Sequence, residues 1–533
     1  MKGILKSSLS FLFRRQSSIL SAAVVIMITY GLSFILGLFK TWLLVRFFFH
    51  TPGLLDAFYA ATIIPDAVFQ LIVAGSISAA FIPVFSKSLA HDESQAWRMA
   101  STILNLVLGF LIFFSIIIFI FASQLSRFTS PGFDISQILI QSQLLRLMLL
   151  SQLFFAISGF LTATLQTNRH FLLPAISPVV YNLSIIIGIV VLSPHLGIFG
   201  PAIGMVIGSV FHLLIQLPLA HKLGFRFSTS FNFRLPEVKE VARLFPPRIF
   251  TIAVDQIEQF SATVISSFLV SGSLTLFNLA KTLSFLPVTL FGVSLGQASL
   301  PALSGYSNTN KFLKFQKSLI DSLLQIAFLV VPLSVLFIVL RVQLVRLAFG
   351  APTLPWKATL VTGQTLAILA ISAVFSAGIQ LLIRSFYALH DTKTPFYTGL
   401  FAAILNVLLS YTFGLYFQMG IAGIAIGWSV VAVLESFVLL ILLFRRLKIS
   451  IIQLMTPLSK ILITGFSTAI ALWAPMRLLD QYVFDTTRTL PLFFLTAISG
   501  LIGFIVYLAM SYFFHVEELL SFLGVFKRLR PRL

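Results

Sequence analysis

Ionisable side chains are rare in the long apolar segments of this sequence, and they are the first candidates for chemistry. Lys40 lies in the middle of the apolar run SFILGLFKTWLLVRFFF, with Arg46 near its end, and Lys281 lies in FNLAKTLSFLP. A cation at the centre of a membrane helix costs roughly 2.5–3.5 kcal/mol on insertion scales, so it usually faces a hydrated cavity or a partner. Lys40 is therefore the first functional candidate. For Arg46 and Lys281 the alternative is a side chain that extends to the membrane surface.

Four acidic residues also fall within apolar segments. Asp255 and Glu258 are three residues apart in PPRIFTIAVDQIEQF and share one helix face. They could bind Na⁺ or a proton, or they could balance Lys40 and Lys281. Asp66 directly follows Pro65 and is either a helix-start residue or a functional one. Glu435 lies deep in SVVAVLESFVLL and needs a partner or a proton.

Signatures of enzymes and metal sites are missing from the sequence. The eight histidines are scattered without ligand spacing, and no cysteine is present. The sequence has no GxxxxGK[ST] loop that could hold nucleotide phosphates. We therefore expect no catalytic residues, no resident metal and no cofactor, with Na⁺ or H⁺ as candidate coupling ions.

The composition places these residues in a membrane. Of the 533 residues, 58% are hydrophobic and 10% are charged, and 57 are phenylalanine. A soluble core could not enclose that much apolar surface. Fourteen apolar segments, from about 20–48 to 490–514, are long enough to span a bilayer. The sequence predicts an all-α polytopic membrane protein.

The net charge of +20 reports topology rather than a nucleic-acid partner. Most of the lysines and arginines fall at the two termini and in alternate loops, the largest group between Lys222 and Arg248. Under the positive-inside rule, this alternation predicts that both termini are cytoplasmic and that the number of spans is even.

A weak internal repeat predicts two lobes. Arg169–Asn182 followed by GIFGPAIG (Gly197–Gly204) resembles His390–Asn406 followed by GIAGIAIG (Gly420–Gly427). A six-span duplication predicts two six-helix lobes in a pseudo-two-fold arrangement, a cavity between them and two additional C-terminal helices. The expected divisions are an N-lobe at 1–220, a cytoplasmic amphipathic linker at 221–245, a C-lobe at 246–450, and the last two spans with a basic cytoplasmic tail at 451–533.

Five further motifs stand out along the chain: SFILGLFKTWLLVRFFF, LLDAFYAATIIPDAVFQ with Asp56, SPGFD (Ser130–Asp134), FLPVTLFGVSLGQASLPALS and RSFYALHDTKTPF. The last motif contains Asp391, Lys393 and Pro395. Together these motifs resemble the MurJ/MviN family of lipid II flippases, which belongs to the multidrug/oligosaccharidyl-lipid/polysaccharide exporter superfamily and for which Asp391, Lys393 and Pro395 are signature residues. The resemblance covers nearly the whole chain.

The resemblance implies a function and a set of site residues. Members of the family move the undecaprenyl-diphosphate-linked peptidoglycan precursor, lipid II, from the inner to the outer leaflet of the bacterial cytoplasmic membrane. A diphosphate that crosses hydrocarbon needs cations in a hydrated cleft, which here implies Lys40 and Lys281, assisted by Arg46. Relatives also have a sodium site, for which Asp255, Asn406 and Ser410 could supply oxygen ligands. Several family arginines are replaced, by Phe34, Lys40, Phe69, Gln70 and Lys281.

The expected protein is therefore a flippase that works by alternating access as a monomer, with membrane lipids and cell-wall synthases as candidate partners. One alternative is an exporter of another lipid-linked oligosaccharide or a drug/ion antiporter of the MATE type, which the replaced arginines favour. A polytopic glycosyltransferase would need acidic residues in an outward loop, where only Asp56 is available. A scaffolding protein that keeps the fold without transport is the last alternative.

Overall fold

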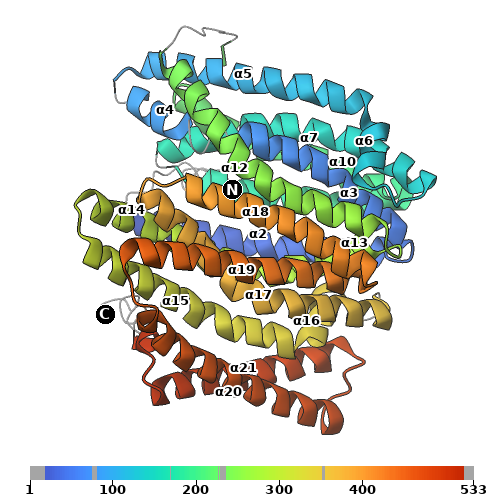
Figure 1. Cartoon of the computed structure of the whole chain (residues 1–533). Coiled ribbons are helices and arrows are strands. Elements are labelled where there is room, and N and C mark those ends of the chain that lie inside the picture. Colours follow the sequence, from blue (N-terminus) through green and yellow to red (C-terminus); the bar gives the residue numbers. More distant parts are fainter. Residues whose placement is uncertain are drawn as a thin grey trace, which may run out of the picture. The chain divides into compact units, whose positions relative to one another are not determined.

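The computed structural model describes residues 19–74, 81–89, 91–168, 170–225, 227–228, 236–350 and 354–520. These parts are helical, and they contain no strand (Figure 1). The chain forms two compact units, residues 1–272 and 273–533. The basic segment of the tail from Lys527 to Arg532 lies outside the described residues.

The described part of the first unit consists of the helices before Gly272 and includes the π-helical segments η1 and η3. They are α2 (Ile19–Phe48), α3 (Pro52–Val68), η1 (Phe69–Ala74), α4 (Ile82–Leu89), α5 (Glu93–Ile120), α6 (Ala122–Thr129), α7 (Ile135–Thr167), α8 (Leu172–Ile187), η3 (Gly188–Leu192), α9 (Ser193–Leu196), α10 (Phe199–Leu214), α11 (Leu217–Lys222) and α12 (Pro236–Ser267).

The second unit begins at Ser273, and its described part includes the π-helical segments η4 and η5. Its elements are α13 (Ser273–Pro287), η4 (Val288–Val293), α14 (Ser294–Asn308), α15 (Phe312–Val339), α16 (Arg341–Phe349), α17 (Trp356–Ala388), α18 (Lys393–Tyr411), η5 (Thr412–Tyr416), α19 (Gly420–Leu447), α20 (Ile452–Tyr482) and α21 (Thr489–Phe513).

Each unit is built around one long helix. In the first unit α7 packs against α3, α5 and α10, and in the second α17 packs against α13, α15 and α19. Both central helices have 33 residues. The aromatic core of the first unit includes Phe81 and Phe160, whose ring centroids are 4.0 Å apart. The last two helices, α20 and α21 (red in Figure 1), pack on each other, and α20 also packs on α15.

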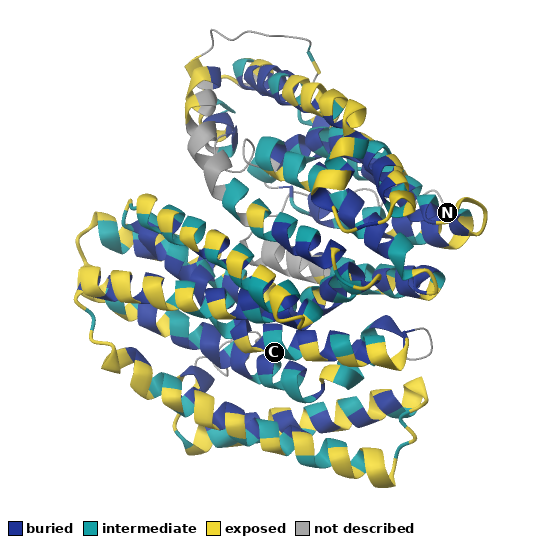
Figure 2. Ribbon diagram, turned by 45° about the vertical axis from the view of Figure 1, so that its right-hand side comes forward, coloured by how far each residue is buried: buried dark blue, intermediate teal, exposed yellow. Residues whose placement is uncertain are grey.

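Many residues on the outer faces of the helices are exposed (yellow in Figure 2), and large apolar side chains are among them. In α5, for example, Phe113 is 59% exposed and Ile120 is 61% exposed. An apolar surface of this extent is unfavourable in water but is compatible with a lipid environment. Thirteen helices in the described part of the chain are long and apolar enough to span a membrane, which confirms the predicted fold class.

The fourteenth predicted span, 246–270, corresponds to α12, which is long enough but is not among these thirteen. Its N-terminal half is polar and begins at Pro236, so the predicted linker at 221–245 overlaps this helix. By packing, α12 belongs to the first unit, since it contacts α3, α5 and α6. The predicted C-lobe at 246–450 would include most of this helix. The predicted lobe divisions otherwise stay a prediction.

The internal repeat is visible in the helices themselves. If α12 is counted as the seventh span, the π-helical segments η1 and η3 occur in the second and fifth spans, and η4 and η5 occur in the eighth and eleventh. The spacing is six spans in both cases, as the sequence repeat predicts. Such segments are rare and often lie at functional sites. A duplicated six-span unit explains their recurrence.

The two glycine motifs also have matching backbones. Gly197 and Gly420 both have positive φ values, +55° and +61°. Later in each motif, a Cβ on Gly204 would approach Ile185 Cα to 2.9 Å, and one on Gly427 would approach Ser410 N to 2.8 Å. In each unit, therefore, a glycine lets the sixth helix of the repeat pack directly on the fifth.

Candidate functional site

Lys40 lies within α2, eight residues before the helix ends, and its side chain is half-buried. The structure brings it into electrostatic range of Asp66 on α3. Asp66 is exposed, and its Oδ1 is 3.5 Å from Gln152 Nε2 on α7. The first unit therefore holds a carboxylate and an amide within hydrogen-bond range among the apolar helices.

Asp66 is not a helix-start residue. Helix α3 begins at Pro52, passes through Pro65 and continues into η1. Of the two alternatives for Asp66, a helix-start residue or a functional one, the first is therefore excluded. A proline within a helix removes one backbone donor but does not always end the helix.

The other two predicted cations contact aromatic rings. Arg46 is exposed near the end of α2, and its guanidinium lies 5.1 Å from the ring centre of Trp42. Lys281 is half-buried in α13, with Nζ 4.8 Å from the ring centre of Trp428 on α19 and 5.7 Å from that of Phe285. An aromatic face stabilises a desolvated cation, so Trp428 orients Lys281 toward α19.

The residues predicted to bind an ion lie in different elements. Asn406 and Ser410 are buried one turn apart in α18, and the Ser410 hydroxyl donates to Asn406 Oδ1 at 3.2 Å. Glu258 is half-buried in α12. Asp255 is in the same helix, but its side chain lies outside the described residues. Among the described residues, no three histidine or acidic side chains are arranged to hold a metal ion.

Asp56 of the family motif is a structural anchor. It is 1% exposed, and its Oδ2 accepts a 2.6 Å hydrogen bond from the backbone N–H of Gly272, which has a φ of +95°. The start of α3 is thereby connected to the turn after α12.

The SPGFD motif, Ser130–Asp134, fixes the other side of that turn. The Gly132 N–H donates to Ser267 Oγ at 3.0 Å, and Asp134 and Gln137 form a capping box that begins α7. The hydrogen bonds from Gln137 and Ser136 lower the pKa of Asp134.

Asp391 joins two helices of the second unit. It accepts hydrogen bonds from the N–H and the hydroxyl of Thr394, at 3.0 and 2.8 Å, and from Arg446 Nη1 at 2.6 Å. Lys393 is exposed at the first position of α18, and Pro395 is buried two residues later. The DTKTP sequence therefore begins α18 and attaches it to the end of α19.

These contacts predict a pH effect. Burial alone would raise the pKa of Asp391, but the bonds from Thr394 and Arg446 outweigh it and lower the pKa. Ionised Asp391 therefore stabilises the fold above the ordinary aspartate pKa of about 3.9, and this contribution is lost as the pH falls through the folded-state value. In thermal melts of the detergent-solubilised protein, Asp391→Ala should cost about 1 kcal/mol at pH 7 and much less at pH 3.

The exposed Asp485 provides the control for this measurement, because it also accepts hydrogen bonds from a nearby threonine, Thr487. Asp485→Ala should leave the melting temperature unchanged. An equal loss for Asp391→Ala at both pH values would show that the carboxylate charge is not what stabilises this junction.

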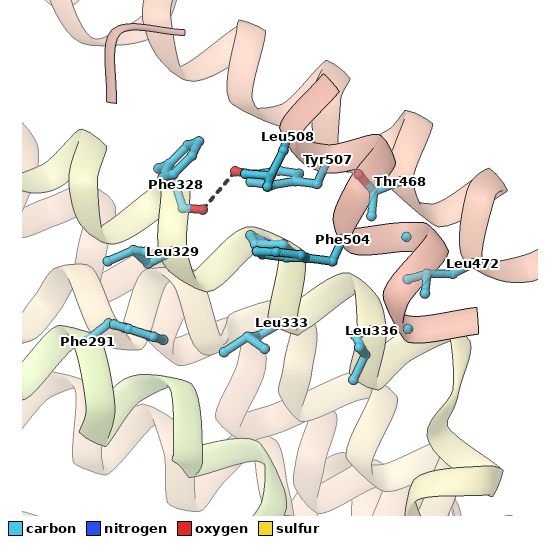
Figure 3. Close-up of a pocket in the computed structure, with 13 residues that line it drawn as sticks. Phe291, Phe328, Leu329, Leu333, Leu336, Thr468, Leu472, Phe504, Tyr507 and Leu508 are labelled. Atoms are coloured by element: carbon cyan, nitrogen blue, oxygen red, sulfur yellow. Dashed lines mark hydrogen bonds between the residues drawn. The ribbon is translucent and has the colours of Figure 1, made fainter. Parts of the chain in front are cut away.

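An apolar groove lies among α15, α20 and α21 (Figure 3). Its volume is about 220 Å³, and its walls include Leu333 from α15, Leu472 from α20 and Phe504 from α21. The Tyr507 hydroxyl donates to the Phe328 carbonyl at 2.7 Å, which satisfies the one polar group of that side chain. Gly500 and Gly503 belong to the wall that α21 contributes. The groove can accept a hydrocarbon chain.

Sequence reasoning missed the partners of the two lysines. Asp66 was available as a candidate, but its proximity to Lys40 depends on how α2 and α3 pack. Trp428 carried no signal beyond being one of five tryptophans in the chain. The sequence predicted the two C-terminal helices but not which of their residues form the groove.

Comparisons with known proteins identify relatives of this chain. The family model described as lipid II flippase MurJ matches residues 44–493. A probable lipid II flippase MurJ of Buchnera aphidicola subsp. Baizongia pistaciae is 27% identical over 436 residues, which cover 81% of this chain and 83% of that protein. The lipid II flippase MurJ of Burkholderia cenocepacia is 29% identical over 78% of this chain and 82% of its own length.

Solved structures agree with these relatives. A lipid II flippase MurJ in an inward closed conformation superposes with a TM-score of 0.77 at 25% identity, and the match covers 93% of this chain and 99% of that one. An inward-facing MATE family multidrug resistance transporter shares the fold, with a TM-score of 0.65 at 14% identity over 78% of this chain and 94% of its own.

Apolar spanning helices in two repeated units, with charged side chains held among them, define a polytopic membrane transporter rather than an enzyme. The family match extends over most of the chain, from the end of α2 to the start of α21. The chain belongs to the lipid II flippase MurJ family.

Proposed function

We propose that the protein translocates lipid II from the inner to the outer leaflet of the bacterial cytoplasmic membrane by alternating access, for cell-wall synthesis. The family match over residues 44–493 carries this proposal. The substrate is a lipid-linked saccharide, and it needs a cationic site for the diphosphate and an apolar path for the polyprenyl tail. Lys40 and Lys281 supply the cations, and the groove among α15, α20 and α21 supplies the apolar path.

We assign diphosphate binding to Lys40 and Lys281, with Arg46 as an outer contact. A phosphate oxygen accepts a charge-assisted hydrogen bond from an ammonium group, and such bonds are stronger than neutral ones. Lys40 lies beside an exposed carboxylate, and Lys281 lies over Trp428. Both positions hold a cation at membrane depth, where a diphosphate needs one.

The groove among α15, α20 and α21 is suited to the polyprenyl tail. Its lining side chains are apolar except for Thr468 and Tyr507, and Tyr507 donates its hydroxyl hydrogen to the protein backbone. Because lipid is itself apolar, the groove positions the tail rather than extracting it from the membrane.

Energy for translocation would come from the membrane potential or from a gradient of Na⁺ or H⁺. Asn406, Ser410, Asp255 and Glu258 are the candidate ion ligands. The positive-inside pattern supports cytoplasmic termini. We also propose that the protein is a monomer and that it interacts with cell-wall synthases.

Complementation tests the function directly. The gene should restore growth to a bacterium depleted of its own lipid II flippase, and lipid II should become accessible to a membrane-impermeant cleaving enzyme at the outer surface. Growth without accessible lipid II, or a normally inserted protein that restores neither, would contradict the proposal. Translocation of a different lipid-linked saccharide in vesicles would then favour the oligosaccharide exporter.

A further inference from the structure

A second groove lies in the second unit between α18 and α19, which pack on each other (Figure 1). Its volume is about 300 Å³, which is enough for a small organic molecule. From α18 the groove is lined by Phe401 and Leu405, four residues apart, and from α19 by Leu434 and Val438 at the same spacing. Each helix therefore contributes one face, formed by side chains from successive turns.

The groove is open on one side and closed at its base. Tyr397 and Phe401 from α18 are exposed, as is Leu434 from α19. Ala402 and Val431, which also line the groove, are 4% and 2% exposed. A ligand can therefore enter from outside the helix pair and rest on a packed apolar floor, without any separation of the two helices.

Glu435 places one carboxyl group in this apolar groove. The side chain is half-buried, and the residue lies near the middle of α19, which runs from Gly420 to Leu447. Because α19 is long and apolar enough to span a membrane, Glu435 lies at membrane depth. An acidic side chain at this depth is costly and is usually connected with function.

The other polar side-chain groups of the groove are two hydroxyls. Thr398 donates its hydroxyl hydrogen to the backbone carbonyls of Thr394 and Pro395, at 2.9 and 3.1 Å. Tyr397 lies one turn into α18 and is exposed. Among the lining residues, all of which the structure describes, Glu435 is the one that carries a charge, so the groove is complementary to a cation.

The lining also selects the kind of cation. Hard metal ions need about six oxygen ligands or keep their water, and a single carboxylate among apolar side chains offers too few. An ammonium ion on an apolar body suits the groove better, because its N–H groups pair with the carboxylate while its body contacts the walls. The exposed ring of Phe401 adds a favourable surface, since aromatic faces attract cations.

The same helix already holds a cation of this protein on an aromatic ring. Lys281 Nζ lies 4.8 Å from the ring centre of Trp428, which is two turns before Glu435 on α19. This lysine suggests the alternative role for Glu435, an internal charge balance that needs no ligand. The two roles differ in one consequence, because only a ligand site loses affinity for an added amine when Glu435 is neutralised.

We propose that the groove between α18 and α19 binds a lipophilic ammonium ion, a protonated amine on a compact apolar body. Its N–H groups donate charge-assisted hydrogen bonds to the Glu435 carboxylate, and its body packs against Phe401 and Leu405. The groove among α15, α20 and α21 has no charged lining residue, so the two grooves suit different ligands. None of the residues that we assign to lipid II lines this site, so the inference goes beyond the proposed function.

Binding of 1-adamantanamine tests the site. This amine carries its ammonium group on a compact hydrocarbon cage and is protonated at pH 7. The tritium-labelled amine is dialysed to equilibrium against the purified full-length protein in detergent, and protein-free micelles give the background. We expect saturable binding of one amine per protein. The neutral 1-adamantanol, which has the same cage, should compete about 10- to 150-fold more weakly, the loss expected for one charge-assisted hydrogen bond.

Substitution of Glu435 separates a ligand site from an internal charge balance. Glu435→Gln keeps the shape of the side chain and removes its charge, so affinity for the amine should fall about 10- to 150-fold while affinity for 1-adamantanol stays the same. Glu435→Asp keeps the carboxylate and should keep most of the binding. Glu517→Gln, at an exposed position after α21, is the matched control and should bind as the wild type does.

A second variant tests the groove without changing the carboxylate. Val438 is exposed on α19, so Val438→Trp can fold, and its larger ring should narrow the groove. We expect weaker binding of the amine and of the alcohol, in similar proportion, with the melting temperature of the wild type.

The outcomes decide the inference separately from the proposed function. An absence of saturable amine binding to the wild type overturns it, and so does an unchanged amine affinity in Glu435→Gln, which would leave Glu435 with charge balance alone. If Glu435→Gln does not fold, equal affinities of the wild type for the amine and the alcohol, or unaltered binding by Val438→Trp, overturn it. Failure to complement a flippase-depleted strain would contradict the proposed function and leave these binding results unaffected.

Discussion

Replacing Lys40 by alanine is expected to abolish lipid II translocation while leaving membrane insertion intact. The half-buried ammonium in α2 is the cation of the first unit that we assign to the diphosphate. Loss of a charge-assisted hydrogen bond costs about 1.5–3 kcal/mol, which corresponds to roughly a 10- to 150-fold loss of affinity. The measurements are complementation of a flippase-depleted strain and binding of geranylgeranyl diphosphate to the purified protein.

Controls keep this result interpretable. Lys40→Arg retains the charge and should retain most of the activity, and Lys357→Ala removes an exposed lysine near the start of α17. Because Lys40→Ala removes one positive charge, the double variant Lys40→Ala/Asp66→Asn tests insertion with no net change of charge. Normal translocation by Lys40→Ala would remove this residue from the site.

Much of the architecture follows from the sequence because lipid imposes simple rules. Backbone groups cannot remain unpaired in hydrocarbon, so long apolar segments must be helices. The repeat was detectable because Gly204 and Gly427 occupy positions where a Cβ would collide with the preceding helix. Because this steric requirement favours glycine at both positions, it is visible in the sequence.

What could not be predicted depends on contacts between distant segments. The polar composition of α12 suggested a separate linker and a place in the second lobe, yet the hydrogen bonds of Gly272 and Ser267 connect its end to the first unit. Asp66 looked like a cap because a proline precedes it, and only the course of α3 through Pro65 shows otherwise. The identity of a single residue does not indicate which distant residue it contacts.

The family signature residues also show what sequence motifs do not reveal about the substrate site. Asp56, Asp134 and Asp391 belong to the motifs that suggested the family, and each one bonds backbone or side-chain groups at a helix end. They hold helices in place, whereas we assign Lys40 and Lys281 to the substrate, at positions where the family resemblance implies arginines. A motif can therefore identify a fold while the residues that bind the substrate differ.

Filling the apolar groove should slow translocation of the long-chain substrate. Gly500 lines the groove, and a Cβ at this position would meet only Leu336 Cδ1, at 3.8 Å, so Gly500→Phe can fold without a backbone collision. The ring would then occupy part of the 220 Å³ that we assign to the polyprenyl tail. We expect about a tenfold lower translocation rate, equivalent to about 1.4 kcal/mol.

The substrate series distinguishes a blocked groove from a damaged protein. Gly500→Phe should bind a short-chain diphosphate as the wild type does, because Lys40 and Lys281 are unchanged, and its defect should grow with the length of the tail. Gly109→Phe is the matched control, since Gly109 is exposed on α5 with open space around it. Equal defects for short and long tails would mean that the tail does not use this groove, and the path of the hydrocarbon chain would have to be sought on another face of the helices.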